Sequence, residues 1–116
     1  MSCPEFIAQS FAVRTAAHLL HLSSNSYSQH VALGDFYEAL AGLVDRYAEA
    51  YMGMESLIKR WPSKTPPSET PVGLLEEYLE FVQAEQGDDE SEALENILAE
   101  IEELTLRTLY KVRNLK

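Results

Sequence analysis

The chain is poor in the residues that crosslink or anchor proteins. It contains one cysteine, Cys3, and three histidines, so it can form no internal disulfide and lacks the ligands of a Cys-rich zinc module. It has no run of about 18 apolar residues that could span a bilayer. Its first residues, MSCPEFIAQ, lack the basic flank and continuous apolar stretch of a signal peptide. These absences predict a cytoplasmic protein without a membrane segment.

Basic residues are also scarce. The chain has nine Lys and Arg residues and 19 Asp and Glu residues, which gives a formal net charge of −10. Such a surface repels phosphate backbones and attracts cations or basic partners. The composition therefore disfavours direct binding to DNA.

Strand-like alternation and internal repeats are absent, whereas helix-capping signals recur along the chain. Ser2 with Glu5 and Ser26 with Gln29 have the spacing of capping boxes, and Thr70 precedes a proline at a first helical position. Asp89 with Glu92 has the same spacing. We predict an all-α single domain over residues 1–116, with the segment WPSKTPPSETP as its one long loop. The four predicted helices span residues 3–23, 27–60, 71–86 and 90–113.

The last two predicted helices each carry one apolar stripe. Each of the first two carries a core stripe and a second face that is not typical of a solvent-exposed surface. In helix 3–23 we expect a core stripe of Phe6, Val13, Ala17 and Leu20, and a second patch of Ile7, Phe11 and Leu22 that includes His18. In helix 27–60 the expected core stripe is Leu33, Phe36, Leu40, Val44, Tyr47, Tyr51, Met54 and Ile58. Beside it lies a face of His30, Gly34, Ala41, Asp45, Ala48, Glu49 and Met52. Two such faces predict a homo-oligomer, at least a twofold dimer, formed through these helices.

Two histidines and two carboxylates form a candidate metal site. A short turn makes the first two helices antiparallel, so His18 and His30 are expected side by side, with Asp45 and Glu49 one turn apart. Asp45 follows His30 by 15 residues, which is roughly 22 Å along one helix, so one chain cannot close the site. A twofold axis would join the imidazoles of one chain to the carboxylates of the other. Such nitrogen and oxygen ligands suit Fe(II), with Mn(II) or Zn(II) as substitutes.

The order His, His, Asp, Glu, with separations of 12, 15 and 4, resembles the ferroxidase signature of Dps-type miniferritins. The segment FYEALAGLVDRYAEAYMG is similar to the second helix of that family, and the hairpin resembles small Dps-like proteins encoded by bacteriophages. The resemblance covers residues 10–60. It implies a ferritin-like four-helix bundle with a long first hairpin and a shorter second pair, located in the host cytoplasm if phage-encoded. It also implies that His18, His30, Asp45 and Glu49 form an intersubunit site where Fe(II) is oxidised to Fe(III).

The sequence departs from the family pattern, and other interpretations remain open. Gly34 stands where the family commonly has a further acidic ligand, and the lysine-rich tail that many members use on DNA is absent. His18 alone is also explained as a packed interface histidine, and Asp45 with Glu49 as a solvated face. His21 is expected to be incidental. The alternative function is a non-enzymatic acidic binding protein, such as a phage protein that docks on a host protein.

Overall fold

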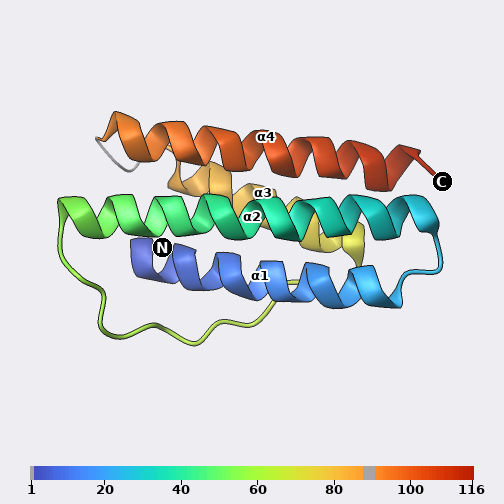
Figure 1. Ribbon diagram of the computed structural model, residues 1–116, viewed down its shortest axis with the longest axis horizontal. Helices are drawn as coiled ribbons and strands as arrows, with labels where there is room; N and C mark the ends of the chain where they lie inside the picture. Colours follow the sequence, from blue (N-terminus) through green and yellow to red (C-terminus); the bar gives the residue numbers. More distant parts are fainter. Residues whose placement is uncertain (1, 88–90) are drawn as a thin grey trace.

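The computed structural model describes residues 2–87 and 91–116, and these residues contain four α-helices (Figure 1). None of these helices combines the length and the apolar character needed to cross a bilayer. The predicted all-α class is therefore confirmed for the described residues. The helices are α1 (Cys3–Ser23), α2 (Tyr27–Met54), α3 (Pro71–Glu85) and α4 (Glu92–Asn114).

The four helices pack as a bundle in which each helix contacts two neighbours. Substantial contacts join α1 to α2, α2 to α4, α4 to α3, and α3 to α1, so α1 and α4 occupy diagonally opposite corners. A short turn makes α1 and α2 antiparallel, and the crossover, residues 55–70, then runs back along the bundle (Figure 1). As a result α3 runs in the same direction as α2, and α4 in the same direction as α1.

Local capping explains where the helices begin. Ser2 and Glu5 form the predicted capping box with both reciprocal hydrogen bonds, and Thr70 caps α3 by accepting a hydrogen bond from the Gly73 N–H. The Ser26 hydroxyl caps α2 by accepting from the Gln29 N–H. The Gln29 side chain accepts from the Ser24 hydroxyl instead of closing the second half of the predicted box.

The start of α4 differs from the prediction by two residues. The predicted capping residue Asp89 lies outside the described residues. The N-cap is Ser91, whose hydroxyl accepts a hydrogen bond from the Leu94 N–H, so α4 begins at Glu92. The capping-box spacing of Asp89 and Glu92 in the sequence therefore did not identify Ser91 as the N-cap.

The predicted extension of α2 to residue 60 is wrong, because the helix ends at Met54. The Glu55 N–H makes the last helical hydrogen bond, to the Tyr51 carbonyl, and the Glu55 backbone then leaves helical geometry. The Ile58 N–H donates to the Met52 sulfur, which keeps Ile58 packed against the core from the crossover. Met54, predicted to be in the core, is half-exposed at this end.

The predicted core stripes are otherwise largely confirmed. α1 contributes buried residues to the side facing α2 and also to the side facing α3, because it lies at a corner of the bundle. Ile7, which we assigned to a second, outward patch, is therefore fully buried, whereas Phe11 and Leu22 of that patch are exposed. The largest buried side chains are Tyr47, Tyr78, Phe6, Phe36, Ile7, Leu33, Leu40, Leu74, Leu75, Leu94, Leu98 and Ile101.

One buried polar chain ties α3 to α1 within this core. The Tyr78 hydroxyl donates to Ser10 Oγ at 2.8 Å, and the Ser10 hydroxyl donates to the Phe6 carbonyl at 2.8 Å. Burial raises the pKa of Tyr78, because the ionised phenol would lose its hydration, so the hydroxyl stays protonated as a donor. Both buried hydroxyl groups are therefore hydrogen-bonded.

Candidate functional site

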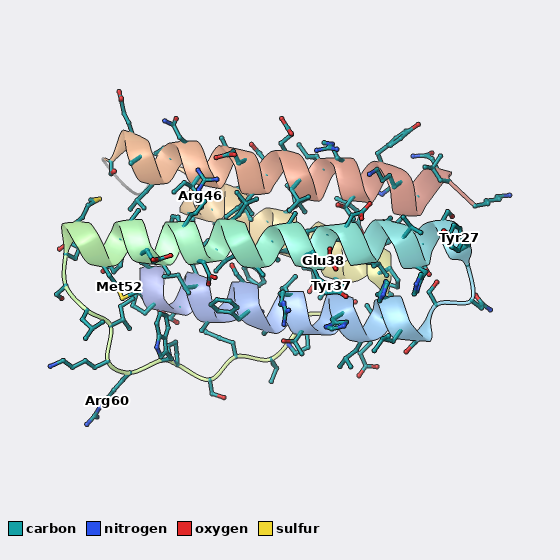
Figure 2. All side chains as sticks on the ribbon, in the orientation of Figure 1. Tyr27, Tyr37, Glu38, Arg46, Met52 and Arg60 are labelled. Atoms are coloured by element: carbon teal, nitrogen blue, oxygen red, sulfur yellow. The ribbon has the colours of Figure 1, made fainter. Side chains whose placement is uncertain are left out.

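The three histidines gather at the α1–α2 turn, but they pair differently from the prediction. His30 on α2 stacks on His21 of α1, with ring centroids 3.8 Å apart and 16° between the planes. His18 stacks on Tyr37 of α2, at 4.0 Å and 13°, and Arg14 lies over the same tyrosine ring. Figure 2 shows Tyr37 at the contact between α1 and α2. His21, expected to be incidental, is therefore the ring that meets His30.

Hydrogen bonds fix the orientation of His21 and His30. His21 Nδ1 donates to the His30 carbonyl, and His30 Nδ1 donates to the His21 carbonyl at 2.8 Å. A carbonyl oxygen can only accept, so each Nδ1 carries a hydrogen, and in a neutral ring the lone pair is on Nε2. The two histidines form a reciprocal clasp between the last turn of α1 and the first turn of α2.

Gly34 provides the space for this clasp. A Cβ atom built at Gly34 would lie 2.9 Å from His21 Cε1 and 3.0 Å from His21 Nδ1, which is too close for an unmoved ring. In the sequence, Gly34 belongs to the face of helix 27–60 that predicts contact with a second chain. The structure shows that the approaching group is an imidazole of the same chain.

The two predicted carboxylate ligands are separate from the histidines. Asp45 and Glu49 are exposed on α2, and neither forms an ion pair with any part of the chain that the structure describes. Arg46, which lies between them in the sequence, reaches α4 and pairs with Glu100 at 3.2 Å. Across residues 2–87 and 91–116 no group of three or more potential ligands could hold a metal ion. The histidines and the carboxylates of one chain are thus apart, as the 15-residue spacing predicts.

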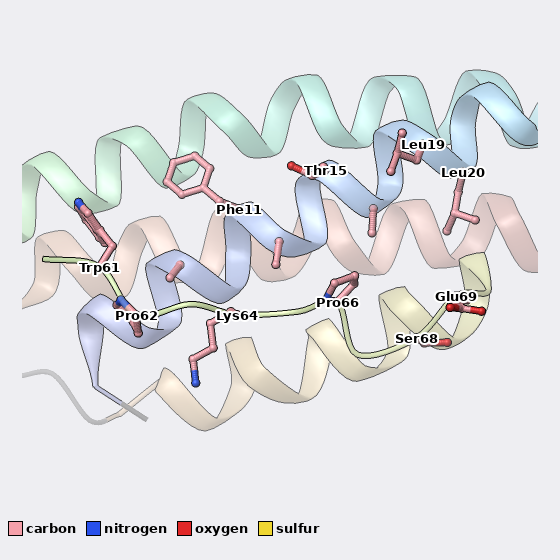
Figure 3. Close-up of a pocket in the computed structure, with 13 residues that line it drawn as sticks. Phe11, Thr15, Leu19, Leu20, Trp61, Pro62, Lys64, Pro66, Ser68 and Glu69 are labelled. Atoms are coloured by element: carbon pink, nitrogen blue, oxygen red, sulfur yellow. The ribbon is translucent and has the colours of Figure 1, made fainter.

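A groove that sequence reasoning missed runs between α1 and the crossover. Its volume is about 930 Å³. Small side chains of α1, including Ala8, Ala12 and Ala16, line it beside Phe11 and Leu19 (Figure 3). The opposite side is lined by crossover residues, namely Trp61, Pro62, Lys64, Pro66, Ser68 and Glu69. The lining is therefore mainly apolar, with only two charged side chains.

Two contacts hold the crossover beside α1. The buried Gln9 side chain donates to the Thr65 carbonyl at 3.0 Å, and Lys64 forms an ion pair with Glu5 at 3.2 Å. Hydrogen bonding from the Ser2 backbone N–H, together with the Lys64 ammonium, lowers the pKa of Glu5 to about 2. The same carboxylate thus caps α1 and positions one side of the groove.

The groove leaves large apolar side chains in contact with solvent. Phe11 is 38% exposed, Leu19 59% and Trp61 47%. The sequence places Phe11 in a second apolar patch of helix 3–23, and this patch is the signal that indicates one wall of the groove. The crossover has no apolar periodicity, so no pattern indicated that Trp61 would complete the other wall.

Comparison with known proteins places this acidic four-helix bundle in a defined family without an assigned activity. Residues 21–112 match the Family of unknown function (DUF5856). The chain belongs to that family, and the match includes His21, His30, Gly34 and Trp61. No curated protein and no solved structure matches the chain. No ferritin or Dps family matches the chain.

We predict that the two internal glycines of α2 respond oppositely to alanine. Gly42→Ala should stabilise the protein by about 0.5–1 kcal/mol, because its new Cβ meets no atom within 4 Å and alanine favours a helix. Gly34→Ala should be less stable than Gly42→Ala by about 1–3 kcal/mol, because His21 must move and break the clasp. Urea unfolding followed by circular dichroism measures both changes.

A His21→Ala background provides the control for this prediction. Without the imidazole, Gly34→Ala should become as stabilising as Gly42→Ala, since the steric conflict is gone. Equal effects of the two alanines in the wild-type background would show that the ring is not held over Gly34.

We also predict an acid-dependent contribution from Glu5. Its folded pKa is depressed from 4.5 to about 2, so its stabilising contribution is complete above about pH 4.5 and is lost as the pH falls towards 2. The difference in unfolding free energy between wild type and Glu5→Gln should therefore shrink across this interval. Lys64→Met should lose only part of the effect, because the Ser2 N–H still binds the carboxylate. A difference that is constant from pH 6 to about pH 2.5 would contradict the prediction.

Proposed function

We propose that the protein is a binding protein that holds an apolar segment of a protein partner in the groove between α1 and the crossover. The observation that carries this proposal is the groove itself, about 930 Å³ in volume, with Phe11, Leu19 and Trp61 left partly exposed. Contiguous apolar surface on a highly charged protein is typical of an interaction site. The non-enzymatic binding role that we considered from the sequence is therefore our first candidate.

The exposure of the walls favours a macromolecular partner over a small ligand. A small-molecule site normally covers most of its ligand, whereas Leu19 and Trp61 are each about half open to solvent. A helix or peptide that lies along the groove can cover both walls and continue beyond them. From Ala8 to Leu20 the groove follows α1 for roughly 18 Å, about three helical turns. An amphipathic helix of a partner fits this length.

Charge favours a basic partner. The chain carries a net charge of −10, and α3, which packs on α1, has four glutamates and no Lys or Arg. Within the groove Lys64 is paired with Glu5, whereas Glu69 is exposed. A segment with apolar residues on one side and Lys or Arg beside them meets both conditions.

Trp61, the only tryptophan of the chain, allows a direct test. A designed amphipathic Leu/Lys helical peptide should shift Trp61 emission to shorter wavelength in a saturable manner, because it covers the indole. Leu19→Glu should weaken this binding by at least about tenfold, since it places a charge in the apolar contact. Circular dichroism should show that the variant is folded, because Leu19 is mainly exposed.

Leu57→Glu is the matched control, because it adds the same charge at an exposed leucine of the crossover that does not line the groove. It should retain peptide binding. Loss of binding in both variants, or no emission change with wild type, would refute the proposal. A response to monomeric dodecyl maltoside that equals the response to the peptide would instead indicate an apolar small-molecule site.

Iron oxidation at a site shared by two chains is our second candidate. Its support is the order of the helices, with one long crossover as in ferritin-like bundles, and the carboxylate pair exposed on α2. The hydrogen bond from His30 Nδ1–H to the His21 carbonyl also leaves His30 Nε2 as the ligating atom, and metal-bound histidines commonly donate their other ring N–H in this way. In this proposal His18 and His30 of one chain and Asp45 and Glu49 of another hold Fe(II) as substrate.

An anaerobic Fe(II) titration followed by peroxide tests this candidate. Saturable binding and rapid formation of Fe(III), measured by absorbance, should be lost in His30→Ala and Asp45→Ala because each removes one ligand of the site. Glu77→Ala, which removes an exposed carboxylate of α3, should leave both unchanged. Wild type that binds no Fe(II) with saturation would exclude iron oxidation.

A further inference from the structure

The last thirteen residues of the chain have the opposite charge to the rest. Residues 104–116 contain four basic residues and no acidic residue, so they carry +4, whereas residues 1–103 carry five basic and 19 acidic residues, or −14. The basic residues of this segment are Arg107, Lys111, Arg113 and Lys116. The segment is helical to Asn114, so Arg107, Lys111 and Arg113 lie on the final turns of α4 and Lys116 follows the helix.

The same turns present apolar side chains to solvent. Leu106 is 48% exposed and Tyr110 is 59% exposed, and their spacing of four residues places them on one face of α4. Arg107 and Arg113 form exposed ion pairs with Glu103 and Glu76. Lys111 forms no ion pair within residues 2–87 and 91–116. The end of α4 therefore has the composition of an amphipathic basic helix.

The groove and this face of α4 cannot meet within one chain. α1 and α4 lie at diagonally opposite corners of the bundle, and the crossover lies beside α1 (Figures 1 and 3). Only another copy can bring the two surfaces together. The contact would be heterologous, because different surfaces of the two copies meet.

We infer that a second copy of this chain is an occupant of the groove, and that it docks through the exposed face of α4 around Leu106 and Tyr110. The inference rests on the proposed function, because it uses the same groove. Leu106 and Tyr110 supply the apolar contact to Phe11, Leu19 and Trp61. The basic residues of the segment then approach the strongly acidic remainder of the other copy, next to Glu69 and α3. Each added copy leaves one groove and one α4 face open, so copies associate head to tail.

Two variants that each disable one surface test the inference. Multi-angle light scattering of wild type at concentrations up to about 1 mM should show a mass that rises with concentration. Leu19→Glu and Tyr110→Glu should each remain monomeric. An equimolar mixture should form a dimer and nothing larger, since one variant retains only a working α4 face and the other only a working groove.

Leu57→Glu is again the control and should associate as wild type does. Circular dichroism of every variant checks that the chain is folded. If Tyr110→Glu associates with itself in the absence of Leu19→Glu, the inference is overturned in favour of a symmetric contact between grooves. Failure of the mixture to form a dimer would also overturn it.

The Leu/Lys peptide separates this inference from the proposed function. A wild-type chain that stays monomeric but still shows the Trp61 shift with the peptide would overturn self-docking and leave the groove as a site for another protein. A wild-type chain that neither associates nor responds to the peptide would overturn both.

Discussion

The crossover must carry the chain from one end of the bundle back towards the other, because α2 and α3 run in the same direction. Its sixteen residues, 55–70, could reach roughly 53–58 Å if fully extended, whereas the molecule measures 43 Å along its longest axis. The segment is therefore long enough, with an extended backbone, to return along the bundle. Its prolines favour an extended backbone and cannot donate hydrogen bonds. Gln9 and the Glu5–Lys64 pair hold this extended segment along α1, and the groove lies between them.

Local signals predicted most of the fold. Ser2, Ser26 and Thr70 each satisfy N–H groups of their own helix, so the start of each helix depends on neighbouring residues alone. The end of α2 depends on a contact between the Ile58 N–H and the Met52 sulfur and on packing of Ile58 against the core. Helical periodicity continues through residue 60, so it could not indicate that tertiary packing ends the helix earlier.

The candidate sites were less predictable, because they depend on shape. Periodicity placed His18 and His30 at the hairpin, but it could not show which rings would stack. The stacking depends on Gly34, which leaves room for the His21 ring, and on Tyr37, whose ring stacks on His18. The groove required the position of the crossover against α1, and Trp61 reaches it from a segment without a repeating pattern. Helical periodicity thus predicted which side chains share a face of α1 or α2. It could not predict the contacts that the crossover makes with α1.

The energetics of the groove explain why charge matters to the proposed binding. Fully burying a large apolar side chain contributes about 1.5–3 kcal/mol, so completing the burial of Phe11, Leu19 and Trp61 adds about 3 kcal/mol in all. A micromolar complex needs about 8 kcal/mol, and association itself has an entropic cost. Contacts in the groove are therefore too few to hold a partner alone. A net charge of −10 adds attraction for basic segments, and salt weakens this attraction. In the proposed function, the groove would thus determine where a partner binds, and the charge would determine which segments are retained.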